Sequence, residues 1–178
     1  MSLGGGRLKR DFAAYSQLEA MNVMLVPGLA IWFGWPRTLV EALALISSIV
    51  AVAGLLVVGT IYWRAVDRRL KARAPAGFAD AMLFADQAER PMMLATIVAT
   101  IMAVVAFTLV GLSRSVIVAG VMTLLAVLEY VNYYHRQLQV IDNAPDFRRL
   151  VVTGRLKKAH MARDLAAYRR RDFEAPSV

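Results

Sequence analysis

The sequence predicts an all-α fold: an integral membrane four-helix bundle of two antiparallel transmembrane hairpins, with interfacial amphipathic helices and a basic cytoplasmic helical tail. Three observations predict it. Hydrophobic residues make up 58% of the 178-residue chain, whereas roughly 45–50% is usual in soluble domains. Long apolar stretches alternate with short turns rich in glycine and proline. Basic residues cluster at every second boundary between these stretches.

Residues 1–21 are predicted to form an N-terminal interfacial helix, because apolar residues recur there near helical spacing beside basic ones. A transmembrane domain follows over residues 22–135. Its first span, about residues 22–35, is shorter than the ~20 apolar residues that a bilayer core requires. The pair Pro27-Gly28 is expected to kink or interrupt this span.

A tight turn at residues 34–37 leads into the second span, residues 38–63. Small side chains such as Ser48 and Gly54 lie along it and permit another helix to approach closely. Glu41 lies near the outer end of this span, where water can reach it. We therefore expect its carboxylate to be solvated.

The middle loop, residues 64–90, is predicted to be cytoplasmic. A break at residues 74–77 separates the end of the second helix from a further surface helix at residues 78–90. Pro91 is expected to occupy the first turn of the third span, whose alanines repeat every fourth residue and suit close helix packing. A minimal turn then leads to the fourth span, which begins near Val116.

The distribution of charge predicts the orientation. Of 21 basic residues, three precede the first span, six lie in residues 64–90 and ten follow His135, which leaves Arg37 and Arg114 for the other side. By the positive-inside rule, both termini and the middle loop are cytoplasmic. We expect a multi-pass protein of a bacterial-type inner (cytoplasmic) membrane.

Residues 136–178 form the basic cytoplasmic tail. It should contain a short helix at residues 147–152 and a longer one at residues 155–171, whose narrow apolar stripe includes Met161 and Leu165. Such a tail is attracted to anionic lipid. Nucleic acid is not an expected partner, because no nucleic-acid-binding motif is recognisable. The residues expected to contact lipid headgroups are Arg68, Arg69, Lys71, Lys157, Lys158, Arg169, Arg170 and Arg171.

A polar cluster near the end of the fourth span is the candidate site for a partner or proton contact. On a helix, Glu129, Asn132, Tyr133 and Arg136 share one face. Glu129 should lie roughly 9 Å below the cytoplasmic boundary, given about 1.5 Å of rise per residue and a core of about 30 Å. Since an ionised carboxylate facing lipid is costly, we expect a buried hydrogen-bonded clasp between helices, with Arg136 as one partner.

His135 completes this candidate site, and two roles are open for its side chain. A neutral imidazole is a sufficient axial ligand for a haem or a chlorophyll-type pigment. Its place at the membrane edge, beside Arg136, favours an ordinary interfacial histidine instead. Tyr130 and Tyr134 point away from the Glu129 face and are expected to belong to the interfacial aromatic belt. No cofactor is expected.

The absence of cysteine excludes a disulfide framework, a thiolate metal site and a cysteine nucleophile. The serines and glycines match no catalytic or phosphate-binding motif. The leading functional hypothesis is therefore a non-catalytic structural or accessory subunit of a larger membrane complex, with other membrane subunits and anionic lipids as partners and energy-transducing complexes among the candidates. The alternatives are a small oligomeric transporter or channel that uses Glu129 and the Pro27-Gly28 break, or a lipid-directed enzyme with a pocket at Glu129 and Asn132.

Overall fold

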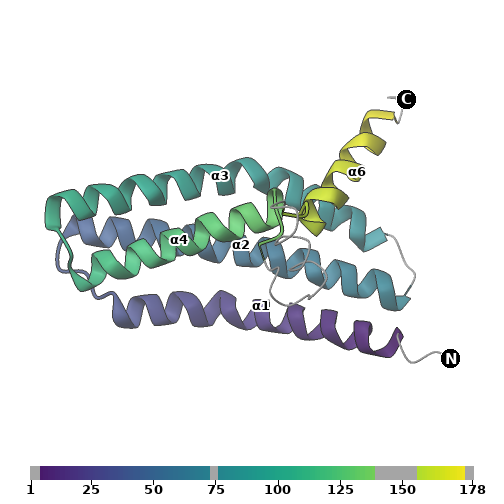
Figure 1. Ribbon diagram of the computed structural model, residues 1–178, viewed down its shortest axis with the longest axis horizontal. Coiled ribbons are helices and arrows are strands. Elements are labelled where there is room, and N and C mark those ends of the chain that lie inside the picture. The colour runs from purple at the N-terminus through teal and green to yellow at the C-terminus, as the bar shows by residue number, and fades with distance from the viewer. Residues whose placement is uncertain (1–4, 73–75, 139–155, 175–178) are drawn as a thin grey trace.

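The computed structural model describes residues 5–72, 76–138 and 156–174, so the helix predicted at residues 147–152 lies outside the described part. The predicted all-α class is confirmed. The described residues form α1 (Gly5–Phe33), α2 (Leu39–Ala72), α3 (Ala76–Val110), α4 (Arg114–Tyr134) and α6 (His160–Glu174). Figure 1 shows α1 to α4 lying side by side, with α6 at one end.

Three of the described helices contain segments that are long and apolar enough to cross a membrane: Leu39–Lys71, Gly77–Val110 and Arg114–Tyr134. The apolar part of α1, Ala20–Phe33, is shorter. Trp32 and Trp35 are 79% and 76% exposed at the end of α1 and in the turn that follows, and tryptophan is enriched at membrane interfaces.

The expected interruption at Pro27-Gly28 is absent, because α1 continues through Pro27 to Phe33. A proline inside a helix removes one backbone hydrogen bond and costs about 3 kcal/mol. Val26 and Ala30, on either side of the proline, pack against the core and offset this cost. The residues predicted as an interfacial helix and those predicted as the first span therefore belong to one continuous helix.

The expectation that Pro91 begins a helix is also wrong. α3 runs from Ala76 through Pro91 to Val110, so the predicted surface helix and the third span are one element. Ala88 and Met92 pack against the core on both sides of Pro91. This packing outweighs the single missing backbone hydrogen bond.

α2 is the central helix and contacts α1, α3 and α4. Its buried face includes Ala51, Val52 and Leu55, each with no exposed surface. Gly54 lies against α3, since a Cβ there would stand 2.6 Å from the sulfur of Met92. The small side chains of α2 thus let this chain's own helices approach closely, as they do for Ala99 of α3, which is fully buried.

Two glycines shape the turns at the end remote from α6. Gly34 follows α1, and a Cβ there would stand 2.7 Å from the carbonyl oxygen of Ala30 and 3.1 Å from side-chain atoms of Leu45 and Val118. Gly111 has a φ of 79°, a conformation that glycine adopts without strain. Each glycine permits a sharp reversal between neighbouring helices.

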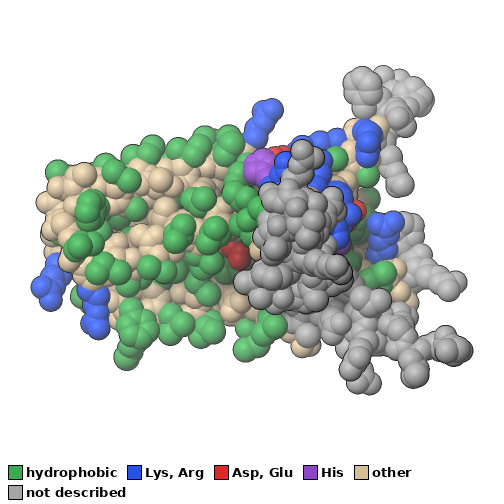
Figure 2. All heavy atoms as spheres, viewed as in Figure 1, with side chains coloured by type: hydrophobic (Ala, Val, Ile, Leu, Met, Phe, Trp, Pro, Cys, Tyr) green, Lys and Arg blue, Asp and Glu red, His purple; other side chains and the backbone are tan. Residues whose placement is uncertain are grey.

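Helix length explains where α6 lies. α2 has 34 residues and α3 has 35, but α4 has only 21. At about 1.5 Å per residue these helices span roughly 51, 52 and 31 Å. α2 and α3 therefore extend past the end of α4, and α6 occupies the resulting step (Figure 1). Figure 2 shows that basic, acidic and histidine side chains gather at this end, while hydrophobic side chains cover much of the body.

Candidate functional site

The structure brings together three members of the predicted cluster. The side chains of Asn132 and Tyr133 lie beside the carboxylate of Glu129, about one turn further along α4. The side-chain oxygen of Asn132 accepts a hydrogen bond from the backbone N–H of Leu138 at 3.0 Å. This network ties the chain that leaves α4 back onto the last turns of the helix.

The Glu129 network lies on the side of α4 that faces α1. Val118, three turns before Glu129 and within about 20° of the same helical face, packs beside Gly34 at the end of α1. Tyr133 is buried, and Glu129 is half-buried. Glu129, Asn132 and Tyr133 all belong to α4, so their contacts lie within one helix, and the predicted clasp between helices stays a prediction.

Arg136 is not joined to Glu129 by an ion pair, although both residues are described. Its guanidinium is exposed and donates to the backbone carbonyl of Leu156 at 3.2 Å. His135 is the C-cap of α4, and its ring lies edge-on to Tyr130 with centroids 5.4 Å apart. The Arg136 side chain therefore reaches the segment before α6, while the His135 ring turns back toward Tyr130 of α4.

An isolated antiparallel bridge joins Arg136 to Lys158. The backbone N–H of Gln137 donates to Lys157 at 2.9 Å, and that of Ala159 donates to His135 at 3.3 Å. Because these hydrogen bonds flank the bridged pair, Arg136 and Lys158 lie directly opposite each other. Side chains at such positions are closest, with Cα atoms about 4.5 Å apart.

An apolar stripe holds α6 against the bundle. Met161 and Leu165 are 2% and 3% exposed and belong to the core, and Tyr168 packs against it. Burial of a side chain of this size contributes about 1.5–3 kcal/mol. The predicted stripe is confirmed, and it contacts protein. The helix begins at His160, later than residue 155.

Polar contacts determine where on the bundle α6 lies. The hydroxyl of Tyr62, near the end of α2, donates to Asp164 at 2.8 Å. Arg169 pairs with two carboxylates of α3, Asp86 at 2.6 Å and Glu89. The hydrogen bond to Glu89 raises the pKa of Arg169 above its ordinary value, so this cation stays charged. Exposed ion pairs contribute only about 0.2–1 kcal/mol each to the free energy of unfolding. They therefore fix the position of α6 more than they stabilise its packing.

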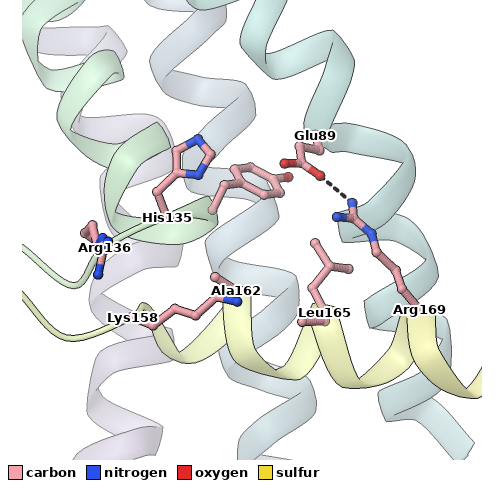
Figure 3. A pocket seen from close by; sticks show the side chains of 9 residues that line it. Glu89, His135, Arg136, Lys158, Ala162, Leu165 and Arg169 are labelled. Atoms are coloured by element: carbon pink, nitrogen blue, oxygen red, sulfur yellow. Dashed lines mark hydrogen bonds and ion pairs between the residues drawn. The ribbon is translucent and has the colours of Figure 1, made fainter.

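A pocket of about 550 Å³ lies between the end of α4 and α6, and we call it the α6 pocket (Figure 3). In Figure 3, Lys158 extends along one side past Ala162, and Arg169 enters from the other side to meet Glu89. Leu165 projects from α6 between them. A second pocket, of about 610 Å³, adjoins it beyond Glu89 and Arg169. The α6 pocket is lined by Glu89, Tyr134, His135, Arg136, Lys158, Ala162, Leu165, Ala166 and Arg169.

Several residues predicted to contact lipid already contact other groups of the chain. Lys71 pairs with Asp67 at 2.6 Å, and Arg69 lies over the ring of Phe78 at 4.5 Å. Lys157 is half-buried, and the side chain of Arg171 lies outside the described part. The predicted lipid-contact residues with exposed side chains and no ion pair to a described carboxylate are Arg68, Arg69, Lys158 and Arg170.

The expectation that Tyr134 belongs to an exposed interfacial belt is wrong. Tyr134 is 5% exposed, and its hydroxyl donates to the carbonyl of Ala85 in α3 at 3.0 Å. The Tyr62–Asp164 contact joins residues 102 positions apart. No local pattern in the sequence indicates either pairing, because each partner lies on another helix.

Comparisons of the chain with protein-family models, with curated proteins and with solved structures found no match. Function is therefore inferred from the geometry of the chain itself.

Proposed function

We propose that this protein is a non-catalytic structural or accessory subunit of a larger membrane complex. We place it in a bacterial-type inner membrane with four spans and both termini in the cytoplasm. The observation that carries the proposal is the large uncovered apolar face of α3. Anionic lipids at the α6 end and other membrane subunits along α3 are the proposed partners.

The apolar windows of α2 and α3 have the same mean hydropathy, 2.5, but very different surroundings. Within the chain, 50% of the α2 window is buried and only 17% of the α3 window. Hydrophobicity of this degree over an 18-residue window suits a membrane, where lipid or another protein covers the helix. α3 therefore offers the broadest surface for a partner.

The exposed face of α3 has the spacing of a helix-packing seam. Leu94, Ile97, Ile101 and Val104 follow one another at alternating intervals of three and four residues, and all are exposed. Large apolar residues at this spacing form the a and d positions of packed helices. Met93 and Val98 beside them are also exposed, so this side of α3 presents a broad apolar surface that a partner helix can cover.

The small-residue faces of α2 and α3 are covered by the chain's own helices. Ser48 and Ala99 are fully buried, and Gly54 lies against Met92. The partner surface is accordingly the face of large residues on α3. The transporter alternative loses the Pro27-Gly28 helix break, because α1 is continuous there. The contacts of Glu129 with its own helix favour a structural role for this residue.

Co-purification in mild detergent tests this function. We expect a stoichiometric partner to accompany the full-length protein and to be lost from the variant Ile97→Ala/Ile101→Ala. The matched control is Val121→Ala/Leu124→Ala on α4, whose residues are also exposed, at 61% and 58%. The control should retain the partner. Purification without any partner, or equal retention by both variants, would contradict the proposal.

A further inference from the structure

We propose that the α6 pocket binds the phosphate group of an anionic phospholipid headgroup, with Arg136 and Lys158 as the two cations that hold it. This inference rests on the proposed membrane location. The general affinity of a basic tail for lipid names no binding site. This inference assigns a ligand class to one particular pocket.

The bridge between Arg136 and Lys158 places two positive side chains directly opposite each other. Like charges at such positions repel and destabilise the pairing. Neither side chain forms an ion pair with a carboxylate in the described part of the chain. An anion between the two cations would remove the repulsion, and a phosphate accepts hydrogen bonds from a guanidinium and an ammonium at once.

The other charges of the pocket are already matched. Arg169 pairs with Asp86 and Glu89, so these carboxylates are engaged by a cation from α6. The Arg136 guanidinium is positioned by the Leu156 carbonyl, and one hydrogen bond leaves other donors available. The net positive charge of the pocket therefore lies on the side lined by Arg136 and Lys158.

The rest of the pocket suits the apolar part of a lipid. Ala162 and Leu165 of α6 are 6% and 3% exposed, and Tyr134 lines the same pocket. A volume of about 550 Å³ is within the usual range for small-molecule sites. Because the pocket begins where the α4 segment Arg114–Tyr134 ends, it lies at the level of the headgroups in the proposed orientation. An acidic segment of a partner protein would match the two cations but would not use this apolar lining.

Native mass spectrometry of the full-length protein in detergent tests the inference, with phosphatidylglycerol and phosphatidylcholine of identical acyl chains as probes. We expect one phosphatidylglycerol to bind in preference to phosphatidylcholine. The variant Arg136→Gln/Lys158→Gln should weaken that binding about tenfold or more. The control Arg64→Gln/Arg163→Gln removes the same charge from exposed residues at the same end of the molecule that do not line the pocket, and it should keep the affinity.

Equal weakening in both variants would show general surface attraction, and no weakening in the pocket variant would show that the two cations hold no lipid. Either result overturns the inference. Displacement of the lipid by millimolar inorganic phosphate would assign the pocket to a free anion, and retention of an acidic protein in place of lipid would assign it to a partner. If the double variant does not fold, Lys158→Gln and Arg64→Gln replace the two doubles.

The two proposals fail in distinguishable ways. If pocket binding is absent while the protein still co-purifies with its partner, only the lipid inference fails. If the protein does not enter membranes, the proposed function itself fails.

Discussion

Glu41 shows how one residue can join two parts of the bundle. Its side chain accepts hydrogen bonds from the backbone N–H groups of Arg37 at 2.7 Å and Thr38 at 3.0 Å. The Thr38 hydroxyl accepts one from the N–H of Glu41 at 3.2 Å. The hydroxyl of Ser113, the N-cap of α4, donates to the same carboxylate.

The expectation of a solvated Glu41 is wrong, because the residue is only 2% exposed. Its contacts with Thr38 form a capping box, and the Thr-x-x-Glu pattern that predicts one is present in the sequence. The link to Ser113 has no such local signal, because the two residues are 72 positions apart. Glu41 thus both begins α2 and fastens it to the start of α4.

A double-mutant cycle on Glu41→Gln and Ser113→Ala tests this link. Each single change should lower the melting temperature of the purified protein by a few degrees, because each removes a contact between the two turns. The double variant should lose less than the sum of the two, since the second change removes an interaction that is already lost. Thermal unfolding in detergent measures all four proteins, and additive losses would contradict a direct link.

At the scale of elements, α6 is held both by apolar burial and by directed polar contacts. Met161 and Leu165 supply most of the stabilisation, because surface ion pairs are individually weak. Tyr62 adds a hydrogen bond to the charged Asp164. Tyr134 instead joins α4 to α3 through the Ala85 carbonyl. The two tyrosines therefore serve different interfaces at the same end of the molecule.

The substitutions Tyr62→Phe and Tyr134→Phe separate these roles. A hydrogen bond to a charged group contributes about 1.5–3 kcal/mol and one between neutral groups about 0.5–1.5 kcal/mol. Tyr62→Phe should therefore speed amide hydrogen exchange in α6 about tenfold or more. Tyr134→Phe should act more weakly, mainly where α3 and α4 meet, and serves as the control. Equal effects of both changes on α6 would show that the Asp164 contact does not hold this helix.

For the whole molecule, unequal helix lengths decide where polar groups gather. α4 spans roughly the thickness of a bilayer core, about 30 Å, while α2 and α3 continue beyond it. The projecting ends carry Asp86, Glu89 and the contact with α6. The α6 pocket occupies the step between the short helix and the long ones.

Cysteine labelling tests the proposed four-span topology, because the natural chain has no cysteine to react. Single variants Gln17→Cys, Leu112→Cys and Arg170→Cys place a thiol at exposed positions of α1, of the α3–α4 turn and of α6. A membrane-impermeant maleimide applied to intact cells should label only Leu112→Cys. Permeabilised cells should give labelling of all three.

The outcome for Gln17→Cys distinguishes four spans from three. If α1 does not cross, Gln17 and the α3–α4 turn need not lie on opposite sides, and Gln17→Cys would be labelled in intact cells. Labelling of Arg170→Cys without permeabilisation would contradict the cytoplasmic placement of α6.

The sequence by itself determined the helical class, the apolar segments in α2, α3 and α4, the turns at residues 34–37 and 111–115, and the apolar stripe of α6. These features depend on composition and on periodicity along a short stretch of chain. Neighbouring residues largely determine the free energies of helix formation and of apolar burial. The Glu129 face was predictable for the same reason, since its members are neighbours on one helix.

Only the tertiary structure decided which residues meet across helices. Pro27 and Pro91 lie inside continuous helices because packing against the core offsets the backbone hydrogen bond that each proline removes. The sequence pattern shows the proline but not this packing. The pairing of Arg169 with Asp86 and Glu89 and the placement of α6 depend on the relative lengths and positions of helices far apart in sequence. Such contacts depend on where whole helices end relative to one another. No local pattern of residues encodes these relative positions.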